Sequence, residues 1–143
     1  MRLPSGNRNL GMGWMTEPRI QQVLVVDDLA DQRAIYRAVL EHRGFQVLEA
    51  EDGEAAVRCA EADRPDLILM DVQLPWMDGW EITRRLKAVP RTAGIPVVAV
   101  SAHVGEEGPG LADESGCSAF LSKMNDPGSV ADVITGLIGD PAG

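Results

Sequence analysis

The sequence predicts a doubly wound α/β fold, in which helices cover both faces of a five-stranded parallel sheet. Five short apolar runs recur along the chain, as expected for strands buried on both faces. Segments with helical spacing of apolar residues separate these runs, so right-handed crossover helices are expected to join the strands. Four of the runs end in acidic, hydroxyl or basic residues, which makes the carboxyl edge of the sheet the expected functional edge.

The first strand and helix surround an acidic turn. The run Val23–Val26 predicts a buried strand, and Asp27 and Asp28 follow it directly. The helix expected over residues 29–43 ends at Gly44, a residue typical of helix C-termini. Its expected apolar stripe consists of Leu29, Ala30, Ala34, Ile35, Ala38, Val39 and His42.

Two further strand and helix pairs follow before residue 90. Strands are expected over residues 45–48 and 67–70, and helices over residues 54–62 and 79–88. Asp52 and Asp78 stand where N-caps are expected, and Glu81 completes a pattern that resembles a capping box. The central strand is followed at once by Asp71, and Pro90 ends the helix that comes after it.

The last part of the chain contains an interrupted helix. Strands are expected over residues 96–100 and 119–122, and a final helix runs from its cap Asp126 to Ile138. The helix expected over residues 104–115 carries Gly108-Pro109-Gly110, where proline costs about 3 kcal/mol and each glycine about 1 kcal/mol relative to alanine. We therefore predict an irregular or shortened fourth helix.

Length and charge restrict the kind of protein. The 143 residues suffice for one domain but not for two, so we expect a stand-alone domain whose output module lies on another chain. The net charge of −9 argues against binding to nucleic acid or to an anionic membrane surface. No apolar run has the length of a membrane span and the first residues lack a signal-peptide core, so we expect a cytoplasmic protein.

The N-terminal residues 1–20 show no helical or strand periodicity and carry prolines and glycines among polar residues. We expect a disordered arm there, an ordered domain over residues 21–139 and a frayed tail over residues 140–143. Met15 offers a second translation start. Two interpretations of residues 1–14 remain open, namely an upstream artefact and a functional basic arm.

The strand ends bring together residue types suited to phosphoryl chemistry. Three carboxylates from Asp27, Asp28 and Asp71 cannot lie close together in ionised form without a cation, and an oxygen-only site suits Mg²⁺. Lys123 supplies a positive charge and Ser101 a hydroxyl donor, which complement the oxygens of a transferring phosphoryl group. Asp71 is then the expected nucleophile, which forms an acyl phosphate.

These motifs resemble those of a bacterial two-component response regulator receiver domain of the single-domain, chemotaxis-regulator kind. The resemblance covers about residues 22–139 and rests on four motifs, namely Val-Val-Asp-Asp at 25–28, Met-Asp-Val-Gln-Leu-Pro-Trp-Met-Asp-Gly at 70–79, Val-Ser-Ala at 100–102 and Leu-Ser-Lys at 121–123. It implies a flavodoxin-like sheet with strand order 2-1-3-4-5.

The resemblance also implies roles for the site residues. Asp71 would accept phosphate from a phosphohistidine on a sensor histidine kinase or a histidine phosphotransfer protein. Mg²⁺, or Mn²⁺ in its place, would be held by Asp28, Asp71 and the backbone carbonyl of Gln73, with Asp27 acting through water. Ser101 and Lys123 would contact the phosphoryl oxygens. Ser101 and Phe120 would act as the switch that signals to a downstream protein through phosphorylation-dependent binding.

Several positions depart from the family pattern or allow more than one interpretation. Met124 follows Lys123 where the family usually has proline, and Phe120 replaces a frequent tyrosine. Trp76 is a hypothetical partner contact, and a ring lying over its own loop is the equally weighted alternative. Gln73 and His103 are hypothetical determinants of phosphate lifetime, although an ordinary exposed loop histidine is the more frequent case.

The sequence also bears on other functions. A receiver-like adaptor that acts without phosphorylation remains the main alternative, because Met124 and the Gly-Pro-Gly interruption affect the output region. An aspartyl-phosphate phosphotransferase or phosphatase is expected to carry a second acid where this chain has Gln73. A flavodoxin needs a phosphate-binding loop where Asp27 and Asp28 would repel phosphate. We therefore expect a signalling domain and not an enzyme with external substrates. The kinase, the target, the phosphate lifetime and the oligomeric state are not determined by the sequence.

Overall fold

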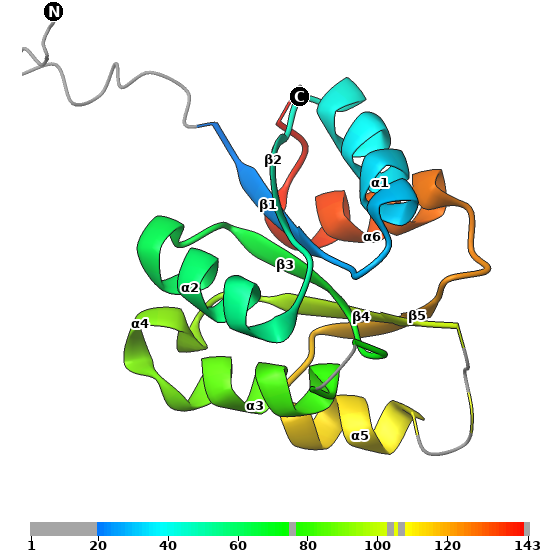
Figure 1. Cartoon of the computed structure of the whole chain (residues 1–143). Coiled ribbons are helices and arrows are strands. Elements are labelled where there is room, and N and C mark those ends of the chain that lie inside the picture. Colours follow the sequence, from blue (N-terminus) through cyan, green and yellow to red (C-terminus); the bar gives the residue numbers. More distant parts are fainter. Residues whose placement is uncertain (1–19, 75–76, 103–104, 106–107, 142–143) are drawn as a thin grey trace, which may run out of the picture.

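The computed structural model describes residues 20–74, 77–102, 105 and 108–141, and these form a five-stranded parallel sheet in the order β2-β1-β3-β4-β5 (Figure 1). The strands are β1 (Gln22–Val26), β2 (Gln46–Ala50), β3 (Leu67–Asp71), β4 (Val97–Ser101) and β5 (Ala119–Ser122). The predicted fold class and strand order are confirmed. The predicted strand ends differ from these by up to two residues, because terminal pairing depends on the neighbouring strand.

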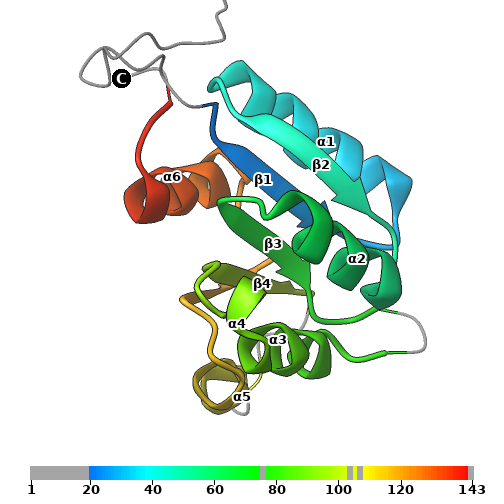
Figure 2. The same ribbon diagram turned by 90° about the vertical axis from the view of Figure 1, so that its left-hand side faces the viewer.

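Helices lie on both faces of the sheet (Figures 1 and 2). The helices are α1 (Ala30–His42), α2 (Gly53–Asp63), α3 (Gly79–Ala88), α4 (Pro90–Ala93), α5 (Gly108–Ser115) and α6 (Pro127–Ile138). One core cluster joins the sheet to α1 and α6, and a second joins its other face to α2 and α3. Successive β1 residues alternate between these clusters, because side chains of a strand point to opposite faces.

Three predicted aspartate N-caps begin helices. Asp52 accepts a hydrogen bond from the Ala55 N–H at 2.8 Å, and Asp126 accepts one from the Gly128 N–H at 3.0 Å. Asp78 accepts one from Trp80 N–H at 2.7 Å. The predicted capping box is incomplete, because the Glu81 carboxylate pairs with Arg84 and does not return to Asp78.

The predicted apolar stripe of α1 is wrong except for Val39, which packs against the core. Leu29 and Ile35 are 54% and 44% exposed, whereas Tyr36 and Leu40 are buried. Tyr36 and Leu40 lie four residues apart on one face and pack into the same cluster as Phe45 and Ile134. The prediction grouped small and apolar residues on one face of the helix. The face that is buried is instead the one that carries the long side chains of Tyr36 and Leu40.

The predicted shortening of the fourth crossover helix is confirmed. This helix is α5 here, since the short α4 after α3 was not predicted, and α5 has 8 residues. Gly108-Pro109-Gly110 forms its first turn and does not interrupt its middle. Proline is tolerated in a first helical turn, where its missing N–H would have no helical partner.

The predicted terminal segments fall almost wholly outside the described residues. Of the predicted arm, only Ile20 is described, and of the predicted tail only residues 140 and 141. The division into arm, domain and tail therefore stays a prediction. Within the described part of the chain, no helix is long and apolar enough to cross a membrane.

Candidate functional site

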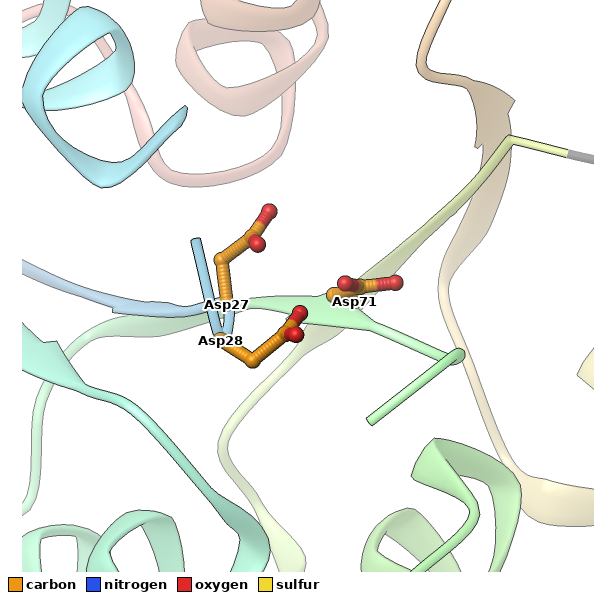
Figure 3. Close-up of side chains that lie close together, drawn as sticks. All are labelled: Asp27, Asp28 and Asp71. Carbon is orange, nitrogen blue, oxygen red and sulfur yellow. The ribbon is translucent and has the colours of Figure 1, made fainter. Parts of the chain in front are cut away.

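Three carboxylates meet where β1 and β3 end. The strands pair with Val26 opposite Met70, so Asp27 and Asp71 emerge side by side at the carboxyl edge of the sheet. Asp27 and Asp71 are each 1% exposed, whereas Asp28 is exposed. One carboxylate oxygen from each of the three side chains lies within 4.8 Å of the others. Figure 3 shows the three side chains projecting into one space beyond the strand ends.

Lys123, which directly follows β5, also reaches this site. Its ammonium nitrogen lies 2.9 Å from Asp27 Oδ2 and 3.0 Å from Asp71 Oδ2. Its backbone N–H donates to the Ser101 carbonyl at 2.9 Å, which holds the residue at the end of β5. Burial alone would lower the pKa of Lys123, but the contacts with Asp27 and Asp71 raise it above its usual value, so the ammonium is charged at neutral pH.

Asp71 is an unusually buried acid. Burial raises its pKa above the usual value, although the Gln73 N–H and Lys123 oppose this rise. The negative charge of Asp27 raises the pKa further. The Gln73 N–H donates to Asp71 Oδ1 at 2.9 Å, while Lys123 occupies Oδ2. Both carboxylate oxygens are therefore held in fixed directions.

The loop after β3 folds back onto the strand it leaves. The Gly79 N–H donates to the Val72 carbonyl at 3.0 Å. A β-carbon at Gly79 would lie 2.5 Å from Val72 Cα and 2.6 Å from the Asp71 carbonyl oxygen, both backbone atoms that cannot move aside. Only glycine permits this close approach, which positions the start of α3 beside Asp71.

Gln73 joins two loops at the mouth of the site. Its side-chain oxygen accepts a hydrogen bond from the Ala102 N–H at 3.1 Å, which links the loop after β3 to the loop after β4. Ser101, the last residue of β4, is buried at 3% exposure. The role of the Gln73 backbone carbonyl as a metal ligand stays a prediction, as does any influence of Gln73 on phosphate lifetime.

Phe120 packs beneath the first turn of α5. Its ring centroid lies 5.5 Å from that of Trp80, with the planes tilted by 56°. A β-carbon at Gly108 would lie 2.3 Å from the Phe120 ring, so glycine leaves the space that this ring occupies. A cavity of about 400 Å³ borders Phe120 and is also lined by Gln73 and Ser101. Phe120 thus lies between the site and the surface formed by α5.

Two residues singled out in the sequence, Trp76 and His103, lie outside the described residues. The hypotheses about them therefore stay predictions. Met124 is 89% exposed, and its presence after Lys123 does not prevent the lysine from reaching both acids.

Sequence reasoning missed Arg33. Its guanidinium donates to the backbone carbonyl of Asp27 at 2.6 Å, so it contacts the acidic turn itself. A basic residue one turn into the helix that follows two acids could have indicated this contact. Every residue carries a backbone carbonyl, so the sequence does not specify which oxygen Arg33 contacts.

The residues present suit a divalent cation. Three carboxylates and one ammonium leave an excess of two negative charges, and a divalent ion would neutralise it. All three ligand atoms are carboxylate oxygens, which Mg²⁺ prefers. Asp28 is exposed, so the cluster is accessible from solvent and leaves room for the waters that Mg²⁺ usually retains.

Comparison with known proteins identifies similar chains. The family model described as the response regulator receiver domain matches residues 23–135. The polar-differentiation response regulator DivK of Brucella anthropi is 32% identical over 120 residues, which cover 84% of this chain and 98% of DivK. The response regulator PleD of Caulobacter vibrioides is 41% identical over 105 residues, 73% of this chain, and the chain spans only 23% of PleD.

A solved structure also bears on the site. The receiver domain of the sensor histidine kinase PA1611 from Pseudomonas aeruginosa has a TM-score of 0.77 and 30% identity. The similarity covers 85% of this chain and 100% of that domain, which was solved with a magnesium ion coordinated in its active site cleft.

Proposed function

Because the chain belongs to the response regulator receiver family, we propose that it accepts a phosphoryl group on Asp71 from a phosphohistidine and transmits a signal by protein binding. The single observation that carries this proposal is the pairing of Lys123 with both buried acids. The arrangement places a fixed positive charge beside the attacking carboxylate, where the phosphoryl oxygens would arrive.

The proposed reaction is a transfer between two protein side chains. An ionised oxygen of Asp71 attacks phosphorus, an O–P bond forms, and the P–N bond to the donor histidine breaks with the electron pair remaining on nitrogen. The imidazole nitrogen then takes up a proton. The Gln73 N–H and Lys123 hold the Asp71 carboxylate in a defined orientation before attack, which lowers the cost of alignment.

The ligands of the metal follow from the same cluster. Asp28 and Asp71 would hold Mg²⁺, or Mn²⁺ in its place, together with the Gln73 backbone carbonyl, while Asp27 would act through water. When bound, the ion supplies positive charge that offsets charge developing on the phosphoryl oxygens. Lys123 and Ser101 would contact those oxygens from the protein side.

The output would begin at Ser101 and Phe120. The phosphoryl group carries close to two negative charges, in place of the single charge of the ionised Asp71 carboxylate, and brings three acceptor oxygens beside Ser101. Reorientation of Ser101 would change the cavity that it shares with Phe120, and the Phe120 ring contacts the first turn of α5. We therefore propose that the surface formed by α5, β5 and α6 changes its affinity for a downstream protein.

The proposed phosphodonor is a sensor histidine kinase or a histidine phosphotransfer protein in the cytoplasm. Two exposed apolar side chains, Leu29 at 54% and Met124 at 89% exposure, directly follow Asp28 and Lys123 along the chain. They suit contact with a protein donor better than with nucleic acid or a membrane, which the acidic net charge disfavours. Trp76 stays a further hypothetical contact.

Intact mass spectrometry tests this function directly. We expect one phosphoryl adduct when the protein is incubated with a small phosphodonor and Mg²⁺, and none when Asp71→Asn is treated in the same way or when Mg²⁺ is chelated. If neither a small donor nor a kinase yields an Asp71-dependent adduct, the proposal is wrong and the phosphorylation-independent adaptor takes its place.

A further inference from the structure

We propose that Arg33 is a positioning residue for the metal site, because it fixes the peptide that joins Asp27 to Asp28. This inference rests on the proposed function, since it concerns the magnesium ion expected there. Arg33 is the basic side chain of α1 that touches the acidic turn, and it does so through the backbone and not through a carboxylate.

The guanidinium of Arg33 bridges the acidic turn after β1 and strand β2. Its Nη1 donates to the Asp27 carbonyl oxygen at 2.6 Å, and its Nε donates to Glu49 Oε1 on β2 at 2.8 Å. The Arg33 side chain is 15% exposed and its bond to the Asp27 carbonyl is partly buried, whereas its bond to Glu49 lies at the surface. A planar guanidinium that makes two bonds in different directions has a defined orientation, which a single flexible ammonium would lack.

The Asp27–Asp28 peptide needs such support. The Asp27 N–H pairs with the Ala50 carbonyl at 3.1 Å, and the Leu29 N–H caps Asp27 Oδ1 at 3.0 Å. Asp27 is thus anchored on its amino side and through its side chain. The Asp27 carbonyl lies in the same plane as the N–Cα bond of Asp28, because the peptide bond is planar. The hydrogen bond from Arg33 therefore sets the direction in which the exposed Asp28 leaves the strand.

The need is electrostatic as well as geometric. Asp27 and Asp28 are adjacent acids that also face Asp71, and Lys123 compensates only one of the three charges, so without a divalent ion the remaining repulsion would push the turn apart. A turn that opens before the metal arrives would have to be reordered on binding, which weakens affinity. Arg33 holds the turn closed without occupying a carboxylate oxygen, so it does not compete with the ion.

Glu49 holds Arg33 in place and also provides a matched control. Glu49 accepts a second bond from Arg37 Nη1, while Arg37 Nε bonds to Glu41 at 3.1 Å. Burial opposes ionisation of Glu49, but its bonds with Arg33 and Arg37 lower its pKa below the usual value, so it is charged at neutral pH. Among the described residues Arg37 bonds only to Glu41 and Glu49. It shares the partner on β2 but not the contact with the acidic turn.

The test compares Arg33→Ala with Arg37→Ala in the full chain. Calorimetric titration with Mg²⁺ alone should show a Kd raised by about 10-fold in Arg33→Ala, the size typical for residues that orient metal ligands. Arg37→Ala should change it less than about twofold. Both variants lose a pairing with Glu49, so urea unfolding should show similar small losses of stability, and a structural defect cannot explain a difference in Kd.

Arg33→Lys and a measurement without metal test the positioning role of Arg33 separately from its charge. Arg33→Lys retains the charge but cannot make both bonds in fixed directions, so its Kd should lie between those of the wild type and Arg33→Ala. In the absence of metal, the backbone amide signal of Asp28 should shift in Arg33→Ala and not in Arg37→Ala.

The outcomes separate the inference from the proposed function. If the wild type binds Mg²⁺ and Arg33→Ala matches Arg37→Ala in both Kd and the Asp28 signal, the inference is overturned while the proposed function stands. A wild-type Kd in Arg33→Lys would reduce the role of Arg33 to its charge and overturn the positioning argument. Absence of Mg²⁺ binding by the wild type would overturn both.

Discussion

The ammonium nitrogen of Lys123 lies 3.0 Å from Oδ2 of Asp71, although 52 residues separate the two along the chain. The contact lowers the pKa of Asp71 against the larger effect of burial, which raises it. The ammonium therefore offsets part of the cost of ionising an acid that is almost wholly removed from solvent. Lys123 is also held by Asp27, so its position does not depend on Asp71 alone.

Replacing Lys123 should make Asp71 a weaker acid. Lys123→Met removes the bond and the charge that lower the pKa of Asp71, while burial and Asp27 still raise it. We expect the titration midpoint of the Asp71 carboxyl carbon, followed by NMR without Mg²⁺, to move to higher pH than in the wild type. Lys87→Met is the control, because Lys87 bonds to the Ala93 and Ile95 carbonyls. A midpoint that stays or falls would contradict the proposed pairing.

Removing the charge of Asp71 should stabilise the metal-free fold. A raised pKa in the folded state means that Asp71 favours folding below the ordinary pKa of an aspartate and loses this contribution as the pH rises through the raised value. Asp71→Asn should therefore have a higher free energy of unfolding than the wild type at pH 7 in urea titrations with a chelator.

Two conditions control that measurement. At a pH where Asp71 is protonated in the wild type, the difference between the two proteins should shrink. Added Mg²⁺ should stabilise the wild type more than Asp71→Asn, because a ligand that binds only the folded state adds stability in proportion to its binding. Equal stability of both proteins at pH 7 would show that burial of Asp71 carries no net cost.

The turn at Gly79 should not tolerate a side chain. Gly79→Ala places a β-carbon 2.5 Å from Val72 Cα, so the backbone must shift, and overpacking of this kind costs about 1–3 kcal/mol. Gly94→Ala is the control, because nothing lies within 4 Å of its added carbon and its φ of −82° suits alanine. The free energy of unfolding should fall in the first variant and change by less than about 0.5 kcal/mol in the second.

The first turn of α5 should control the position of Phe120. Gly108→Ala would bring a β-carbon to 2.3 Å from the ring, so we expect Phe120 to leave its contact with Trp80. The near-UV circular dichroism of the aromatic pair should change. Gly110→Ala lies in the same turn with nothing within 4 Å and should leave the signal unaltered. An unchanged signal in Gly108→Ala would mean that α5 moves in place of the ring.

Met124 should contribute to recognition of the protein donor and not to the chemistry. Met124→Ala is expected to slow phosphoryl transfer from a kinase by about fivefold or more, as loss of an exposed apolar anchor does at interfaces. Its rate with a small phosphodonor should stay at the wild-type value. Leu137→Ala is the control, because Leu137 is a 42% exposed side chain in the last turn of α6. A parallel loss with both donors would place Met124 in the reaction itself.

Much of the fold could be predicted because local signals identify it. Buried strands appear as apolar runs, and the caps Asp52, Asp78 and Asp126 bond to N–H groups two or three residues away. The gathering of Asp27, Asp28 and Asp71 could also be predicted, since adjacent parallel strands end at one edge. Family motifs pointed to Lys123, whose contacts with two acids depend on the tertiary structure.

The sequence by itself determined the succession of the five strands and the five longer helices along the chain, the aspartates that begin three helices and the identity of the acids at the sheet edge. These features depend on neighbours in the chain or on the rule that parallel strands share an edge. Only the tertiary structure decided which face of α1 is buried, that Arg33 bonds to the backbone of Asp27, and that Phe120 fills the space left by Gly108. Those relationships join atoms from distant segments or from side chain to backbone, and their distances are set by how whole elements pack.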